Sequence, residues 1–141
     1  MWTAKLVCVA VLASALPVSA PVAQDVVVAA SAAKPAIMRI LEADNLDIET
    51  LPASEVAERM SEIKQGAAPT EFWTAYQAHV RAWQDYARAK ARAQRVDALS
   101  GDTIDGGAIV DARTRINRTF DAVELIAKRF GAWPPRTQTR F

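Results

Sequence analysis

The sequence contains few of the residues that bind metals or form covalent links. Its 141 residues include one Cys, one His and five Gly. A structural zinc site needs about four Cys or His ligands, so this composition excludes one, and no cofactor or metal site is predicted. Basic residues number 17 and acidic residues 16, a balance that gives no overall field for attracting nucleic acid. We therefore expect no nucleic acid among the partners.

The amino terminus has the layout of a secretory signal peptide. Lys5 precedes an apolar run of 11 residues, which small residues follow. The run is too short for a membrane span, which needs about 20 residues, although an uncleaved anchor is the alternative. We predict a signal peptide over residues 1–23, cleaved after Ala23, and a periplasmic or secreted mature protein. Cys8 lies within that leader, so the mature chain forms no disulfide.

Prolines and glycines divide the rest of the chain. Residues 24–35 show no amphipathic period and end at a proline, which predicts a flexible lead-in. Apolar residues then recur at spacings of three and four through residues 36–133, so we predict one helical domain there. A Pro-Pro pair opens residues 134–141, which are predicted to be a frayed tail.

Three stretches of this domain have the length and periodicity of helices, at about residues 52–66, 70–99 and 109–131. Because a short Gly-rich turn joins the last two, they should pack as an antiparallel hairpin, with the first helix covering its open side. The predicted fold is all-α. It is a three-helix bundle built on a long antiparallel helical hairpin, with a short extra N-terminal helix or arm.

Aromatic side chains gather on one face of the second helix. Five of the ten aromatic residues lie within 15 positions, from Phe72 to Tyr86. At about 100° per residue most of them share one arc, which favours burial in the core. The alternative is an aromatic ligand pocket between helices, with Trp73, Tyr76 and Trp83 as binding residues.

The single histidine, His79, lies in the middle of this aromatic stripe. Setting the midpoint of the hairpin near residue 103 brings Glu124 within about one turn of it. A His79–Glu124 pair is either a general base with its orienting carboxylate or a buried hydrogen bond that fixes helix register. The structural role is favoured because no nucleophile has a motif context, and Thr119 is the nearest hydroxyl. We therefore assign no catalytic residue, and a hydrolase- or lyase-type enzyme is the alternative.

Charge is segregated along the sequence. Residues 88–118 hold seven basic residues and four Asp, whereas residues 25–71 hold nine acidic and four basic residues. Arg88, Arg92 and Arg95 share a narrow arc opposite the aromatic stripe. This arc is either a solvated face with local ion pairs or a docking surface for an anionic envelope component. Lipid headgroups of a membrane surface and a cell-wall polymer are two such components.

Two segments of the domain carry a pattern seen elsewhere. They are Glu-Phe-Trp-Thr-Ala-Tyr-Gln-Ala-His-Val-Arg-Ala-Trp at residues 71–83 and Phe-Asp-Ala-Val-Glu-Leu-Ile-Ala-Lys-Arg-Phe-Gly at residues 120–131. Together they resemble small exported helical proteins of unknown function from bacteria. The resemblance covers about residues 45–132 and implies the same helical fold. It implies no activity, cofactor or catalytic residue.

These observations predict an exported, non-enzymatic helical scaffold or binding module of the cell envelope. Its partner is expected to be an envelope protein or an anionic surface polymer. The surroundings of His79 separate this class from an enzyme. A catalytic histidine needs an open cleft, whereas a structural one is enclosed and hydrogen-bonded.

Overall fold

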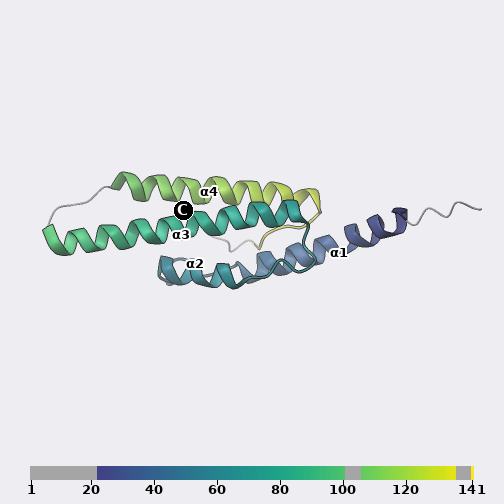
Figure 1. Cartoon of the computed structure of the whole chain (residues 1–141), viewed down its shortest axis with the longest axis horizontal. Helices are drawn as coiled ribbons and strands as arrows, with labels where there is room; N and C mark the ends of the chain where they lie inside the picture. The colour runs from purple at the N-terminus through teal and green to yellow at the C-terminus, as the bar shows by residue number, and fades with distance from the viewer. Residues whose placement is uncertain (1–21, 101–105, 136–140) are drawn as a thin grey trace, which may run out of the picture.

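The computed structural model is all-helical, which confirms the predicted fold class. It describes residues 22–100, 106–135 and 141, and these ranges contain no strand. The helices in this part of the chain are α1 (Val22–Ala43), α2 (Ala53–Glu62), α3 (Thr70–Ser100) and α4 (Gly106–Arg129). Helices α3 and α4 lie side by side along most of their length, and α2 packs on α3 (Figure 1).

Helix α1 begins earlier than the sequence predicted. Residues 24–35, predicted to be a flexible lead-in, are helical, and the helix continues through Pro35. Alanine is frequent there and has the highest intrinsic helix propensity, which offsets the missing amphipathic period. Burial of Ala33 and Ile37 on either side of Pro35 holds the turn that the proline weakens. The end of α1 packs against the other helices, while its start projects beyond them (Figure 1).

The predicted signal peptide, residues 1–23, lies outside the described residues except for its last two positions. Those two residues, Val22 and Ala23, begin α1. Among the described residues, no helix combines the length and the apolar character that crossing a membrane requires.

Helix α2 is short and amphipathic, as its spacing predicted. Val56 and Met60 are buried on the face that meets α3. The helix ends at Glu62, about one turn before the predicted stop, and Ile63 continues in an extended conformation with ψ of 133°. Gly66 instead supplies a positive φ of 56° in the turn that leads to α3.

Helices α3 and α4 run in opposite directions and share the main core. Ion pairs join Glu71 to Arg129 and Asp85 to Arg115, so the start of α3 lies beside the end of α4. The inner faces of both helices are buried: Phe72, Tyr76, Val80, Trp83 and Tyr86 on α3, and Ala112, Ile116, Phe120, Val123 and Ala127 on α4.

Gly131 terminates α4, as predicted. Its φ of 68° lies in the left-handed region that favours glycine. The N–H of Ala132 donates to the carbonyl of Ala127 at 3.0 Å, and the N–H of Gly131 donates to that of Lys128 at 2.9 Å. These two bonds form a Schellman motif, which satisfies carbonyl groups that the helix leaves free.

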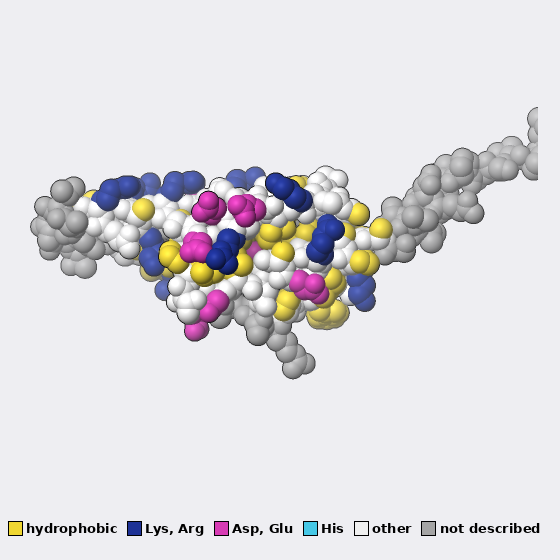
Figure 2. Space-filling view, turned by 90° about the horizontal axis from the view of Figure 1, so that it is seen from below, with side chains coloured by type: hydrophobic (Ala, Val, Ile, Leu, Met, Phe, Trp, Pro, Cys, Tyr) yellow, Lys and Arg dark blue, Asp and Glu magenta, His cyan; other side chains and the backbone are white. Residues whose placement is uncertain are grey.

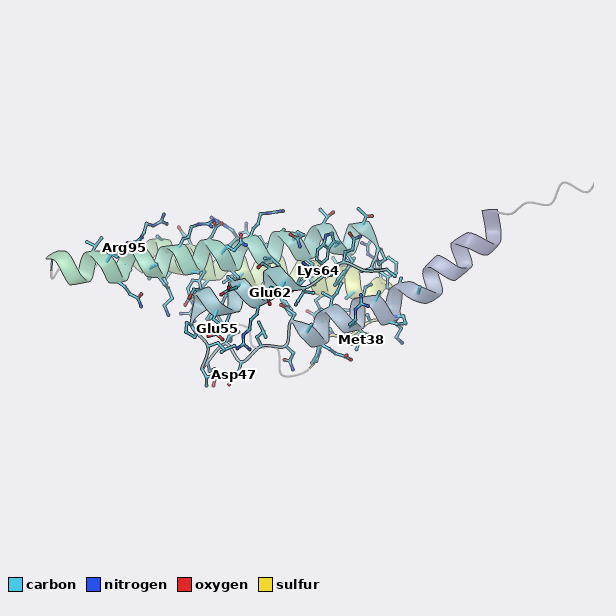
Figure 3. All side chains as sticks on the ribbon, turned by 60° about the horizontal axis from the view of Figure 1, so that its bottom comes forward. Met38, Asp47, Glu55, Glu62, Lys64 and Arg95 are labelled. Carbon is cyan, nitrogen blue, oxygen red and sulfur yellow. The ribbon has the colours of Figure 1, made fainter. Side chains whose placement is uncertain are left out.

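The α3–α4 pair extends beyond α2 at the end nearest residues 101–105 (Figure 1). Arg95 lies on this part of α3, whereas Glu55 and Glu62 lie on α2 beside the middle of α3 (Figure 3). We call residues 88–96 of α3 and 106–115 of α4 the basic extension.

Candidate functional site

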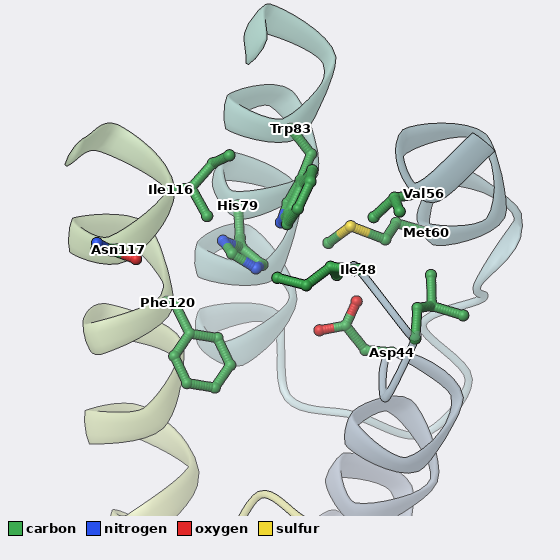
Figure 4. A pocket seen from close by; sticks show the side chains of 10 residues that line it. Asp44, Ile48, Val56, Met60, His79, Trp83, Ile116, Asn117 and Phe120 are labelled. Carbon is green, nitrogen blue, oxygen red and sulfur yellow. The ribbon is translucent and has the colours of Figure 1, made fainter. Parts of the chain in front are cut away.

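A small cavity lies where α2, α3 and α4 meet the segment that follows α1 (Figure 4). Its volume is about 30 Å³, far below the roughly 300–1,000 Å³ of typical ligand pockets. Such a space admits about one or two water molecules and no organic substrate of ordinary size. The cavity is lined by Asp44, Leu46, Ile48, Val56, Met60, His79, Trp83, Ile116, Asn117 and Phe120.

His79 is enclosed beside this cavity. It is 4% exposed, and its Nδ1 lies 3.0 Å from Oγ1 of Thr119. Oγ1 of Thr119 also lies 2.9 Å from the main-chain oxygen of Arg115 and 3.0 Å from that of Ile116, both of which are acceptors for its hydroxyl. The ring of Phe120 packs on His79 with 5.5 Å between centroids. His79 therefore contacts Thr119 and Phe120 of α4.

Burial lowers the pKa of His79 from 6.5 to about 4, with a smaller opposing effect from a hydrogen bond to the main chain of Ile116. The ring is therefore uncharged at neutral pH. His79 bonds to Thr119, and Glu124 pairs with Lys128 at 2.8 Å, in place of the predicted His79–Glu124 pair.

The register of the helix pair differs from the predicted register. The cross-helix ion pairs Glu71–Arg129 and Asp85–Arg115 are centred on residue 100 of the sequence. The predicted centre was near residue 103. Because the helices run in opposite directions, the position on α4 level with His79 moves from about residue 127 to about residue 121. Thr119 and Glu124 both lie within one turn of that position, and Thr119 is the one whose side chain contacts His79.

Asp44 is a buried acid that the sequence analysis did not single out. It is 8% exposed and accepts a hydrogen bond from Oη of Tyr76 at 3.1 Å. Burial raises the pKa of Asp44 from 3.8 to about 7, and the bond from Tyr76 lowers it in part. Burial also raises the pKa of Tyr76, so the phenol keeps its proton. The pair ties the end of α1 to α3.

The three aromatic residues predicted for ligand binding contribute to core packing. Tyr76 is fully buried and Trp83 is 4% exposed. Trp73 is half-buried and stacks on Tyr76 with 5.5 Å between ring centroids. The rings therefore fill the space between helices in which the ligand was predicted.

The chain matches no protein-family model, no curated protein and no solved structure. The resemblance to small exported bacterial proteins therefore stays a prediction. Any function has to follow from the surface and the side chains of the helices. Two further regions are relevant, the basic extension and the contacts of Phe141, of which Trp83 and Asn117 also line the cavity.

The basic extension carries six basic residues and one acidic residue, Asp111. Arg88 and Arg115 both pair with Asp85. Arg92 and Arg95 are exposed, and the described residues form no ion pair with either. Figure 2 shows basic side chains along this end of the molecule and acidic ones nearer the middle.

A polar groove runs between α3 and α4 in the basic extension. Its volume is about 310 Å³. Alanines form its floor, and Asp85 holds two arginines at its edge. The groove is lined by Asp85, Arg88, Ala89, Arg92, Ala108, Asp111, Ala112 and Arg115.

Phe141 packs on the helix pair, although the tail that carries it was predicted to be frayed. The five residues before it lie outside the described part of the chain. Its ring lies 5.3 Å from that of Trp83 and 5.1 Å from that of Tyr86, measured between centroids. Burial of an aromatic ring stabilises this contact, whereas the prediction for the rest of the tail concerns residues that lie mostly outside the described part of the chain.

The side-chain amide of Asn117 contacts Phe141 as well. Its Nδ2 donates to the main-chain oxygen of Phe141 at 3.2 Å. Its Oδ1 is buried and has no hydrogen-bond partner among the described residues. Such an acceptor destabilises a protein by about 1–3 kcal/mol relative to a bonded one. Sequence reasoning missed Asn117 because one Asn in an amphipathic helix gives no signal of its surroundings.

Proposed function

We propose that this chain is an exported, non-enzymatic helical scaffold or binding module of the cell envelope. In this proposal the helices form a three-helix bundle on a long antiparallel hairpin, and the start of α1 is an arm. The basic extension binds anionic groups of an envelope polymer or of lipid headgroups. The enclosed state of His79 supports a non-enzymatic role, because a general base must come within about 3 Å of a substrate proton.

The exposure of the basic extension carries the docking proposal. Arg92 and Arg95 are free of ion pairs with described residues, so an external anion can bind them without breaking an internal contact. Arg88 and Arg115 lie across the groove from each other, both held by Asp85. Basic residues beside an anionic membrane contribute about 1 kcal/mol each to binding.

Export is the first expectation of this proposal. A carboxy-terminally tagged chain expressed in bacteria should be recovered from the periplasm or medium without roughly its first 20–30 residues. Intact-mass spectrometry of the purified protein measures the cleavage point. Soluble cytoplasmic protein that retains Met1 would contradict the proposed location.

Salt-dependent binding to anionic surfaces is the second expectation. The variant R88Q/R92Q/R95Q should bind phosphatidylglycerol vesicles about a hundredfold more weakly than the wild type at low salt, because three basic contacts are lost. Wild-type binding should weaken steeply towards physiological salt, where charges are screened over about 8 Å. Vesicle co-sedimentation measures both effects, and pull-down with cell-wall fragments tests the polymer.

A charge-matched control distinguishes the basic extension from general attraction. The variant K34Q/R59Q/R129Q removes the same number of charges from exposed positions outside the extension. It should bind like the wild type. An equal loss of vesicle binding in both triple variants, or binding that does not change with salt concentration, would contradict the proposal.

A further inference from the structure

Phe141 is held by contacts to its ring and to its main chain. Trp83 and Tyr86 pack on the ring, with centroid distances of 5.3 and 5.1 Å. The guanidinium of Arg113 lies 4.5 Å from the ring centroid, within the range of a cation–π interaction. Asn117 donates to the main-chain oxygen at 3.2 Å. A site that contacts both an aromatic ring and the backbone beside it has the features of peptide recognition.

The unpartnered oxygen of Asn117 indicates that Phe141 satisfies this site only in part. A side-chain amide has donors on nitrogen and acceptor positions on oxygen, so it can pair with the C=O and the N–H of one peptide residue together. In an extended peptide these two groups of a residue point to the same side. Phe141 supplies the oxygen, whereas Oδ1 of Asn117 stays buried without a donor from the described residues.

We propose that Trp83, Tyr86, Arg113 and Asn117 form a binding site for an extended peptide segment of a partner protein that carries an exposed phenylalanine. The partner residue inserts its ring between the two aromatic rings and beneath Arg113. Its main-chain oxygen and N–H pair with Nδ2 and Oδ1 of Asn117. Phe141 is then an internal competitor, which occupies the ring position and leaves the second hydrogen bond unmade.

Competition by Phe141 has a measurable consequence. A ligand binds only the fraction of molecules in which its site is free, so an internal occupant lowers the apparent affinity by that fraction. Removal of the Phe141 ring should therefore strengthen peptide binding. A ring that serves only to cover the core would give no such gain.

The experiment compares wild type with the variant F141A. The probe is a peptide labelled at its amino terminus, fluorescein-Thr-Gln-Thr-Arg-Phe-Ala-Ala-amide, and fluorescence polarisation measures its binding. F141A should bind this peptide about tenfold more tightly than the wild type. A peptide with Ala in place of Phe should not bind either protein. Equal affinity of F141A and wild type, or no binding to F141A up to about 1 mM, would overturn the proposal.

Two further changes test the role of Asn117 within F141A. Asn117→Asp keeps the shape of the side chain but replaces the donor with an acceptor, so peptide binding should fall about tenfold or more. A peptide with N-methyl-phenylalanine lacks the N–H expected to reach Oδ1 and should bind correspondingly weakly. Thr114→Ala, at an exposed position on the same helix, is the matched control and should leave binding unchanged. Binding that neither Asn117→Asp nor N-methylation weakens would overturn the assigned recognition.

Discussion

Replacement of Trp83 by alanine is expected to lower the free energy of unfolding by about 3–5 kcal/mol. The ring is 4% exposed and packs edge-on against Tyr86, with 5.8 Å between centroids. It also lines the cavity between α2, α3 and α4, so its removal enlarges a space that already exists. Small domains have about 5–15 kcal/mol of stability in total, so this loss is a large part of it.

Phe120→Ala should lower the free energy of unfolding by a similar amount, about 3–5 kcal/mol. Phe120 is 8% exposed and lines the same cavity from α4. Urea melts followed by circular dichroism measure both variants. Trp133→Ala and Leu125→Ala are controls, because these residues are 62% and 66% exposed, and each should cost less than about 1 kcal/mol. A loss below about 1 kcal/mol for Trp83→Ala would mean that the aromatic face is open and would restore the ligand-pocket interpretation.

Asp44 and His79 are expected to oppose each other in the pH dependence of stability. The folded chain keeps the proton of Asp44 up to about pH 7, whereas the unfolded chain loses it above pH 3.8. Protonated Asp44 therefore contributes to the free energy of unfolding. This contribution is fully present below pH 3.8 and is lost as the pH rises through about 7.

His79 acts in the opposite direction. The unfolded chain protonates the ring below pH 6.5, whereas the folded protein keeps it neutral down to about pH 4. The contribution of neutral His79 to the free energy of unfolding is fully present above pH 6.5 and is lost as the pH falls through about 4. Between these values each state binds one proton at these two residues, the folded state on Asp44 and the unfolded state on His79. The two opposing pH dependences cancel, so the two groups together do not change the free energy of unfolding between about pH 4 and 6.5.

Replacing either residue alone should make the free energy of unfolding depend on pH in this window. Relative to the wild type, Asp44→Asn should become more stable as the pH rises from about 4 to 6.5, and His79→Gln less stable. Each difference is on the order of 3 kcal/mol across this window, at about 1.4 kcal/mol per pKa unit. Urea melts at several pH values between about 4 and 7 measure these differences. The double variant should again show no pH dependence of the free energy of unfolding from these two residues. Slopes of the same sign in both single variants would contradict the expectation.

The helices themselves could be predicted because their signals are local. Repeated apolar spacing predicted α2, α3 and α4, and the positive φ of Gly131 ends α4 where the sequence placed its cap. Helix α1 was missed in part because its first half has high propensity without an apolar stripe. Propensity without periodicity is a weaker signal, and the proline within the helix opposed it.

The site residues depended on distances that no local pattern contains. His79 was found because it is the single histidine, but its contact depended on which side chain within one turn of the facing position points towards it, and the sequence does not show this. Asp44 and Asn117 gave no signal, since an acid in a turn and an Asn on a helix are ordinary at the surface. Phe141 was assigned to a frayed tail because sequence alone does not show which apolar surface a distant residue meets.

Composition and spacing alone predicted the all-helical fold class, the buried stripes of α2 to α4 and the concentration of basic residues at one end of α3 and α4. These follow from composition and from a period of about 3.6 residues, which are fixed before any two segments meet. Packing of the helices was needed to place His79 beside Thr119, Asp44 beside Tyr76 and Phe141 beside Asn117. Hydrogen bonds form over about 3 Å, so they depend on how whole helices pack, and small differences in register change every partner.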